Sequence, residues 1–217
     1  MAAVGLLYVG AVLFINGVML LGWVDSKSAA PMNVFVGVLQ VVTPTYLIFT
    51  ADGDANQILG ASGLYLFGFT YLYVAFNLLA GLDGTGLGYF SGFVAVSALI
   101  FSWINFATFD DNAFGVIWLH WAFLWGLFFL LLGLKRDRLG PYTGAVAAIE
   151  GWITGTIPAF LLLTDNFAER NNLIAVVLAI VGVVAYGGIY ILFPGLHQSS
   201  LAVSDAGVQH TATATTT

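Results

Sequence analysis

The sequence has no cysteine and very little charge, and each shortage excludes a class of protein. Without cysteine, the chain can form no disulfide, no thiolate metal site and no thiol nucleophile. Only 7% of its residues are charged and 60% are hydrophobic, whereas a soluble domain typically has about 25% charged residues. The net charge of −6 gives no basis for binding nucleic acid. Composition alone therefore predicts an integral membrane protein.

Histidine is also scarce. Its three copies, His120, His197 and His210, are too widely scattered to predict a metal cluster. The sequence contains no phosphate-binding loop, Ser/His/Asp set or metal-ligand spacing. We therefore expect neither an enzyme nor a bound cofactor.

Long apolar runs are abundant. A helix needs roughly 17 to 25 residues to cross a bilayer, and the connections between the runs are short and rich in Asp, Gly and Asn. The first run lacks a basic leader, so we interpret it as a retained span. We expect an all-α fold with seven transmembrane helices: Ala2–Trp23, Met32–Phe49, Ala61–Leu79, Tyr89–Phe106, Ala113–Leu134, Tyr142–Thr164 and Leu173–Phe193.

The basic residues predict the orientation of the chain in the membrane. Lys27, Lys135, Arg136 and Arg138 follow odd-numbered spans, and only Arg170 follows an even one. Because basic residues concentrate in cytoplasmic loops, the N-terminus is expected outside and the C-terminus in the cytoplasm.

A weak internal repeat accompanies this topology. Glycines at 5 and 63 and at 10 and 68, and aspartates at 25 and 83, share one shift of 58 residues. We interpret the shift as a sign of duplicated helix pairs, each joining an odd span to the next even one. Residues 1–195 are expected to form a single transmembrane domain, and residues 196–217 a disordered cytoplasmic tail.

Two spans carry stripes of large aromatic rings. Trp118, Trp121 and Trp125 share one face of the fifth span over roughly 10 Å, at about 1.5 Å per residue. Phe69 and Tyr73, with Asn77, follow an i, i+4, i+8 stripe on the third span. Aromatic stripes commonly serve as core packing. Here the two stripes overlap in depth, which favours a slot for a flat, neutral solute, since ion pores need rings of carbonyls or charges.

Four polar residues inside the spans are further candidates. Glu150 is the one carboxylate within a span, where a charge costs at least ~2.5 kcal/mol; it either contacts a solute N–H group or has a structural role. Asn16 and Asn77 can bind a urea-like solute through their amides, but interhelical hydrogen bonding is the favoured interpretation. His120 is displaced by about 100° from each neighbouring tryptophan, as expected for a helix-contact residue.

Several segments resemble the bacterial urea channel and short-chain amide transporter family. They are Leu7-Tyr8-Val9-Gly10 with Asn16-Gly17, Met32 to Gly37, Phe67-Gly68-Phe69-Thr70-Tyr71-Leu72-Tyr73, Ile117 to Trp121, and Ile149-Glu150-Gly151. The resemblance covers the first six spans in order. It implies a homohexamer in the bacterial inner membrane, with one pore in each protomer formed from helix hairpins. It also implies constrictions at Leu6, Leu13, Phe69, Tyr73, Trp121 and Trp125, with Trp118 and Glu150 close by.

Two departures favour the amide-transporter branch of that family. The seventh span is additional to the six of the acid-gated urea channel, and the loop between Thr50 and Gly60 is short and lacks histidine. We therefore expect a passive channel for short aliphatic amides or urea, not gated by acid, that supplies a cytoplasmic amidase or urease. The alternatives are a proton-coupled permease that uses Glu150 and a membrane scaffold or sensor that transports nothing.

Overall fold

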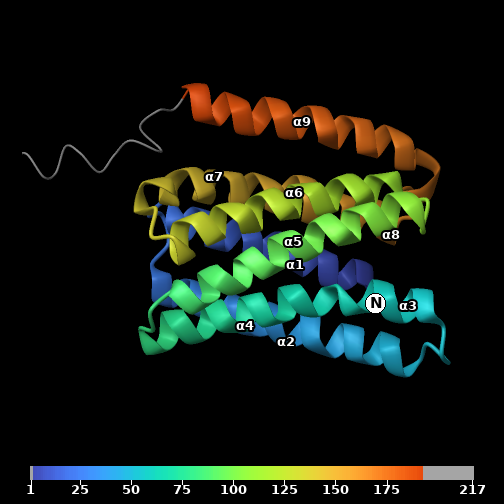
Figure 1. Ribbon diagram of the computed structural model, residues 1–217, viewed down its shortest axis with the longest axis horizontal. Helices are drawn as coiled ribbons and strands as arrows, with labels where there is room; N and C mark the ends of the chain where they lie inside the picture. Colours follow the sequence, from blue (N-terminus) through green and yellow to red (C-terminus); the bar gives the residue numbers. More distant parts are fainter. Residues whose placement is uncertain (1, 193–217) are drawn as a thin grey trace, which may run out of the picture.

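In the computed structural model, which describes residues 2–192, the chain is a bundle of long helices (Figure 1). Within residues 2–192, seven helical segments are long and apolar enough to span a membrane, which confirms the predicted all-α class and number of spans. The predicted tail at 196–217 lies outside the described residues. The elements are α1 (Ala2–Leu20), α2 (Ser26–Phe49), α3 (Ala55–Ser62), α4 (Leu64–Ala80), α5 (Thr85–Ala107), α6 (Asn112–Phe128), η1 (Phe129–Gly133), η2 (Asp137–Leu139), α7 (Gly140–Glu150), η3 (Gly151–Thr156), α8 (Ile157–Leu163), η4 (Ala168–Arg170) and α9 (Asn171–Leu192).

Aspartate caps explain why two spans begin earlier than hydropathy predicts. The Asp25 side chain accepts hydrogen bonds from the backbone N–H groups of Lys27 and Ser28, so α2 begins six residues before Met32. The Asp54 side chain caps α3 in the same way, by accepting hydrogen bonds from the backbone N–H groups of Asn56 and Gln57. Satisfying these N-terminal donors stabilises a helical turn that the apolar pattern does not reveal.

The strongest helix pairs differ from the predicted odd-to-even hairpins. Helix α2 packs mainly against α4, α5 against α6, and α1 against α7, η3 and α8. The third span thus pairs with the second, the fifth with the fourth, and the first with the sixth. The last of these contacts joins the two ends of the unit formed by the first six spans, which we call the six-span unit. Figure 1 shows α9 along one edge of the bundle, where it packs against α6 and α7.

Glycines make the contact between the first and sixth spans possible. A Cβ atom on Gly155 would lie 2.6 Å from the Cα of Gly10, and one on Gly144 would lie 2.8 Å from the carbonyl oxygen of Gly17. The two backbones therefore touch directly, as small residues allow in membrane bundles. The sequence shows these glycines, but not which helix each one faces.

Two spans contain a wide helical turn. The end of the fifth span, η1, and the segment η3, which begins directly after Glu150, are π-helical. Such turns occur frequently at functional sites because they change the direction of the side chains that follow. Here η3 places Thr154 against α6, where its hydroxyl accepts a hydrogen bond from Trp121.

Candidate functional site

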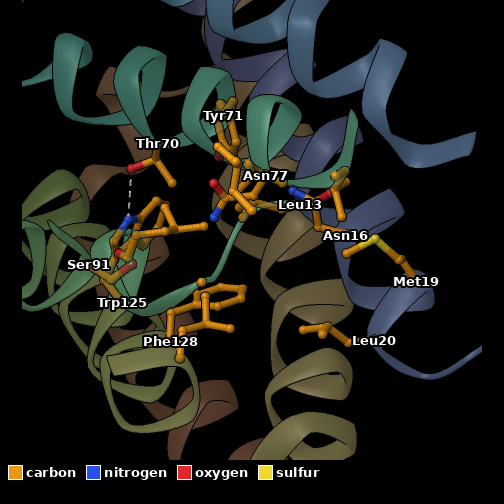
Figure 2. A pocket seen from close by; sticks show the side chains of 16 residues that line it. Leu13, Asn16, Met19, Leu20, Thr70, Tyr71, Asn77, Ser91, Trp125 and Phe128 are labelled. Atoms are coloured by element: carbon orange, nitrogen blue, oxygen red, sulfur yellow. Dashed lines mark hydrogen bonds between the residues drawn. The ribbon is translucent and has the colours of Figure 1, made fainter. Parts of the chain in front are cut away.

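Two cavities enter the bundle from opposite ends of α1, α4 and α6. The first, shown in Figure 2, has a volume of about 300 Å³ and reaches from Leu20 and Leu82 to Trp125. The second has a volume of about 240 Å³ and reaches from Ala2 and Leu64 to Trp121. Each can hold several waters or one small solute, since a water occupies about 30 Å³.

The linings of the two cavities end within about one helical turn of each other on α1, α4 and α6. On α1 the second cavity ends at Val9 and the first at Leu13; on α6 they end at Trp121 and Trp125. On α4 they end at Phe67 and at the turn containing Thr70 and Tyr71. We call this group of side chains the aromatic barrier: Val9, Leu13, Phe67, Tyr71, Trp121 and Trp125, all with exposures of 3% or less.

Phe67 is the centre of the aromatic barrier. Its ring lies 4.6 Å from that of Trp121 and 5.0 Å from that of Trp125, both edge-on, and 5.7 Å from that of Trp118. Edge-to-face pairs of this kind are favourable beyond the area they bury. Trp118 stacks in turn on Phe101 of α5, with centroids 4.7 Å apart.

Threonine hydroxyls fix two of the tryptophans. The Trp121 indole N–H donates to Thr154 Oγ1 at 3.0 Å, and the Trp125 indole N–H donates to Thr70 Oγ1 at 3.2 Å (Figure 2). Each threonine also donates to the carbonyl four residues earlier in its own helix, at 2.7 Å. Both indoles are therefore held by a rigid backbone, and their N–H groups are not available to a solute.

Several buried polar atoms beside the cavities have no hydrogen-bond partner among the described residues. They are the Tyr71 hydroxyl and both side-chain amide atoms of Asn77, two residues that line the first cavity, and Oε1 of Gln40, which lines the second. Unpaired polar groups in such places are costly unless a water or solute satisfies them. Hydroxyl and amide groups of this kind can donate to and accept from a small polar solute.

The structure brings most of the predicted residues together. Leu6, Trp118 and Trp121 line the second cavity, and Leu13, Asn16, Asn77 and Trp125 line the first. Asn16 also has the interhelical role that the sequence favoured, since it exchanges two hydrogen bonds with Asn33 of α2, at 2.9 and 2.7 Å. The Asn77 side chain makes no such bond to any of the residues that the structure describes.

The predicted stripe on the third span requires a correction. Phe69 is 50% exposed and stacks on Tyr65, and neither Phe69 nor Tyr73 lines either cavity. The face that meets the tryptophans instead contains Phe67, Thr70 and Tyr71. Phe67 and Tyr71 precede Phe69 and Tyr73 by two residues each. Aromatic residues occupy both faces of α4, so spacing alone could not identify the inward one. Packing of Gly68 against the Gln40 backbone fixes that choice.

His120 and Glu150 lie beside this site and line neither of the two cavities. His120 contacts α9, as expected for a helix-contact residue, through Tyr186 and the Leu178 carbonyl. Glu150 is fully buried; its Oε1 accepts from the Tyr186 hydroxyl at 3.0 Å, while Oε2 has no partner among residues 2–192.

Sequence reasoning missed Phe67, Tyr71, Gln40 and Thr154. Gln40 could have been found, because it is a long polar side chain in the middle of an apolar span. It is 1% exposed and lies against Gly5 of α1, with Oε1 2.8 Å from the position of an added Cβ atom. Thr154 gave no comparable signal, because its role depends on the π-helical turn.

The Asn16–Asn33 pair leads to a first prediction. Replacing Asn33 with alanine leaves the Asn16 amide without its partner, and interhelical hydrogen bonds of this type contribute about 0.6 to 1.7 kcal/mol. We expect a fall in free energy of unfolding of about 1 kcal/mol, measured by denaturation in detergent. The Asn16→Ala/Asn33→Ala double variant should lose less than the sum of the two single variants. Simple additivity would contradict this coupling.

A family model described as AmiS/UreI family transporter matches residues 1–166. The chain is 57% identical over 185 residues to a putative amidate substrates transporter protein of Mycolicibacterium smegmatis, covering 85% of this chain and 86% of the relative. It is 36% identical to the acid-activated urea channel of Helicobacter pylori strain J99, covering 75% of this chain and 97% of that one. The cryoEM structure of the Helicobacter pylori urea channel in its closed state superposes with a TM-score of 0.69 at 36% identity, covering 76% of this chain and 98% of that chain.

Proposed function

This chain belongs to the AmiS/UreI transporter family, and from that premise we propose that it is a passive channel for short aliphatic amides or urea. One observation supports this proposal most strongly: the linings of two cavities end within about one helical turn of each other, at residues that include Phe67, Trp121 and Trp125. A flat, neutral solute can pass the aromatic barrier through small movements of the rings. A hydrated ion finds no charged side chain in the lining of either cavity to replace its water.

The proposed path follows the inner faces of three helices. It is lined by Leu6 and Leu13 of α1, by Phe67 and Tyr71 of α4, and by the α6 tryptophans. We propose that Gln40, Tyr71 and Asn77 bind the amide group as it enters and leaves the aromatic barrier. Phe69 and Tyr73 have no part in this path.

Liposome swelling tests the proposal. Protein reconstituted into vesicles should conduct acetamide, formamide and urea far faster than empty vesicles do, while acetate at the same concentration should not enter. The comparison of acetamide with acetate is matched in size and isolates charge as the selected property. Equal entry of acetamide and acetate would contradict selection for neutral solutes, and no flux of any solute would favour the scaffold interpretation.

A coupled permease is the alternative within transport, with Glu150 as the proton carrier. The position of Glu150 does not favour it, because this side chain lines neither of the two cavities and hydrogen bonds to α9. A proton carrier must exchange protons with the aqueous phase, which requires a hydrated route. We therefore retain the channel as the proposed function.

We predict that amide flux changes less than about twofold between pH 5 and pH 7.5. Acid gating in this range needs a group such as histidine on the exposed side, whereas His120, the one histidine within residues 2–192, is 6% exposed. Among the loop carboxyls, hydrogen bonds from Lys135 and Thr85 hold the pKa of Asp83 well below its usual range. The Lys135–Asp83 ion pair, 2.7 Å long, therefore keeps its stabilising effect at pH 5 and loses it only as the pH falls through that lowered pKa. A several-fold rise in flux on external acidification would contradict the prediction.

The orientation and assembly are also proposals. We propose that the protein lies in the bacterial cytoplasmic membrane as a homohexamer, with its N-terminus outside, and supplies a cytoplasmic amidase or urease. The four basic residues at one end of the bundle, Lys27, Lys135, Arg136 and Arg138, support this orientation. A reporter fused after Thr217 should be cytoplasmic, and one inserted at Asp52 external. The reverse pattern would overturn the proposed orientation.

A further inference from the structure

A buried chain of polar groups connects α9 to the six-span unit. The Tyr186 hydroxyl of α9 lies 2.5 Å from His120 Nδ1 of α6 and 3.0 Å from Glu150 Oε1 of α7. The other ring nitrogen, His120 Nε2, lies 3.2 Å from the Leu178 carbonyl oxygen, also on α9. All three side chains are buried, with exposures of 6%, 9% and 0% for His120, Tyr186 and Glu150. The family match ends at residue 166, so Tyr186, the central residue of this polar group, lies beyond the matched region.

The number of hydrogen atoms that these hydrogen bonds require can be counted. A carbonyl oxygen only accepts, so the contact with Leu178 requires a hydrogen on His120 Nε2. Two contacts remain, from Tyr186 to His120 and from Tyr186 to Glu150, and each needs one hydrogen. The tyrosine hydroxyl has only one. The second hydrogen must therefore be carried by the Glu150 carboxyl or by His120 Nδ1.

We propose that His120, Tyr186 and Glu150 share this additional proton, so that the set carries no net charge. In one arrangement the Glu150 acid donates to the Tyr186 oxygen, and Tyr186 donates to a neutral His120. In the other, a doubly protonated His120 donates to Tyr186, which donates to the Glu150 carboxylate. The two arrangements interconvert when one proton moves from Glu150 to Tyr186 as the tyrosine proton moves to His120, so charge is conserved.

Within residues 2–192, the remaining titratable side chains in this part of the bundle are tyrosines, which carry no positive charge. They are Tyr71 of α4 and Tyr142 of α7, which donates to the Tyr186 backbone carbonyl at 3.1 Å. Tyr190 packs edge-on against Tyr142, with centroids 5.7 Å apart. The lysines and arginines of the chain all lie in connections or at helix ends. A bare carboxylate beside a neutral His120 would leave a net charge inside the membrane and one of the two contacts without a hydrogen.

This assignment makes Tyr186 a positioning residue and gives α9 a specific role. Tyr186 holds the Glu150 carboxyl in place and couples it to the His120 ring. The carboxyl therefore carries no uncompensated negative charge beside the proposed path of the solute. A neutral solute is unaffected by this, whereas a cation finds no uncompensated negative charge at Glu150 to attract it.

Spectroscopy of the full chain in detergent tests the proposal without reference to transport. At pH 7.5 we expect one of two signals: an infrared C=O band of a protonated carboxylic acid that is absent in Glu150→Gln, or the nitrogen resonances of an imidazolium that are absent in His120→Gln. Tyr186→Phe should shift whichever signal is present, whereas Tyr46→Phe, at an exposed tyrosine of α2, should not. Two results would overturn the proposal: an ionised Glu150 together with a neutral His120, or a signal that is unchanged in Tyr186→Phe.

Discussion

Replacing Trp125 with alanine is expected to join the two cavities and to admit amides too bulky for the wild-type barrier. The indole is 1% exposed and lies between the first cavity and the ring of Phe67. Its removal opens the aromatic barrier on the side of the first cavity. Flux of a bulky amide should rise by more than about tenfold, since about 1.4 kcal/mol of lost barrier already gives that factor. Liposome swelling with acetamide and a larger amide side by side measures the change in selectivity.

Two further variants make that experiment decisive. Trp103→Ala removes the same side chain from α5 where it is 67% exposed, so it should leave selectivity unchanged. Truncation of a buried tryptophan costs about 3 to 5 kcal/mol, so Trp125→Phe provides a milder change that keeps a ring and loses the hydrogen bond to Thr70. Wild-type selectivity in a folded Trp125→Ala protein would exclude this residue from the path.

Two phenylalanines on one helix give the second large contrast. Phe67 is 1% exposed and contacts three tryptophans, whereas Phe69 is 50% exposed. Phe67→Ala should lower the free energy of unfolding by about 3 to 5 kcal/mol and change solute selectivity, as measured by denaturation in detergent and by swelling. Phe69→Ala should do neither. Because the two substitutions are chemically identical and two residues apart, the opposite result would restore the Phe69 and Tyr73 stripe as the lining face.

The sequence predicts the fold well because the bilayer imposes a strong and simple pattern. Helix number follows from runs of apolar residues, and all seven predicted spans are present. The pairing of helices is different, because it depends on which glycine meets which backbone. Gly10 and Gly155, far apart in the chain, make a contact that hydropathy does not encode.

The site is predictable to the extent that its residues are distinctive. Three tryptophans at helical spacing on α6 indicate a shared face, and all three line the two cavities. On α4 the signal is ambiguous, because the segment from Leu64 to Tyr73 has rings on several faces. The contacts of Tyr186 could not be predicted from the sequence, because nothing in an apolar span indicates that its hydroxyl lies beside Glu150 and His120.

Acetamide transport under an imposed proton gradient tests the central proposal most directly. Vesicles containing the protein would be given increasing acetamide concentrations, with and without a pH difference across the membrane. A passive channel predicts an initial rate that rises linearly with concentration, is the same in both conditions, and stops when the inner and outer concentrations are equal. Saturable uptake that concentrates acetamide inside the vesicle only when the proton gradient is present would contradict the channel and establish a coupled permease.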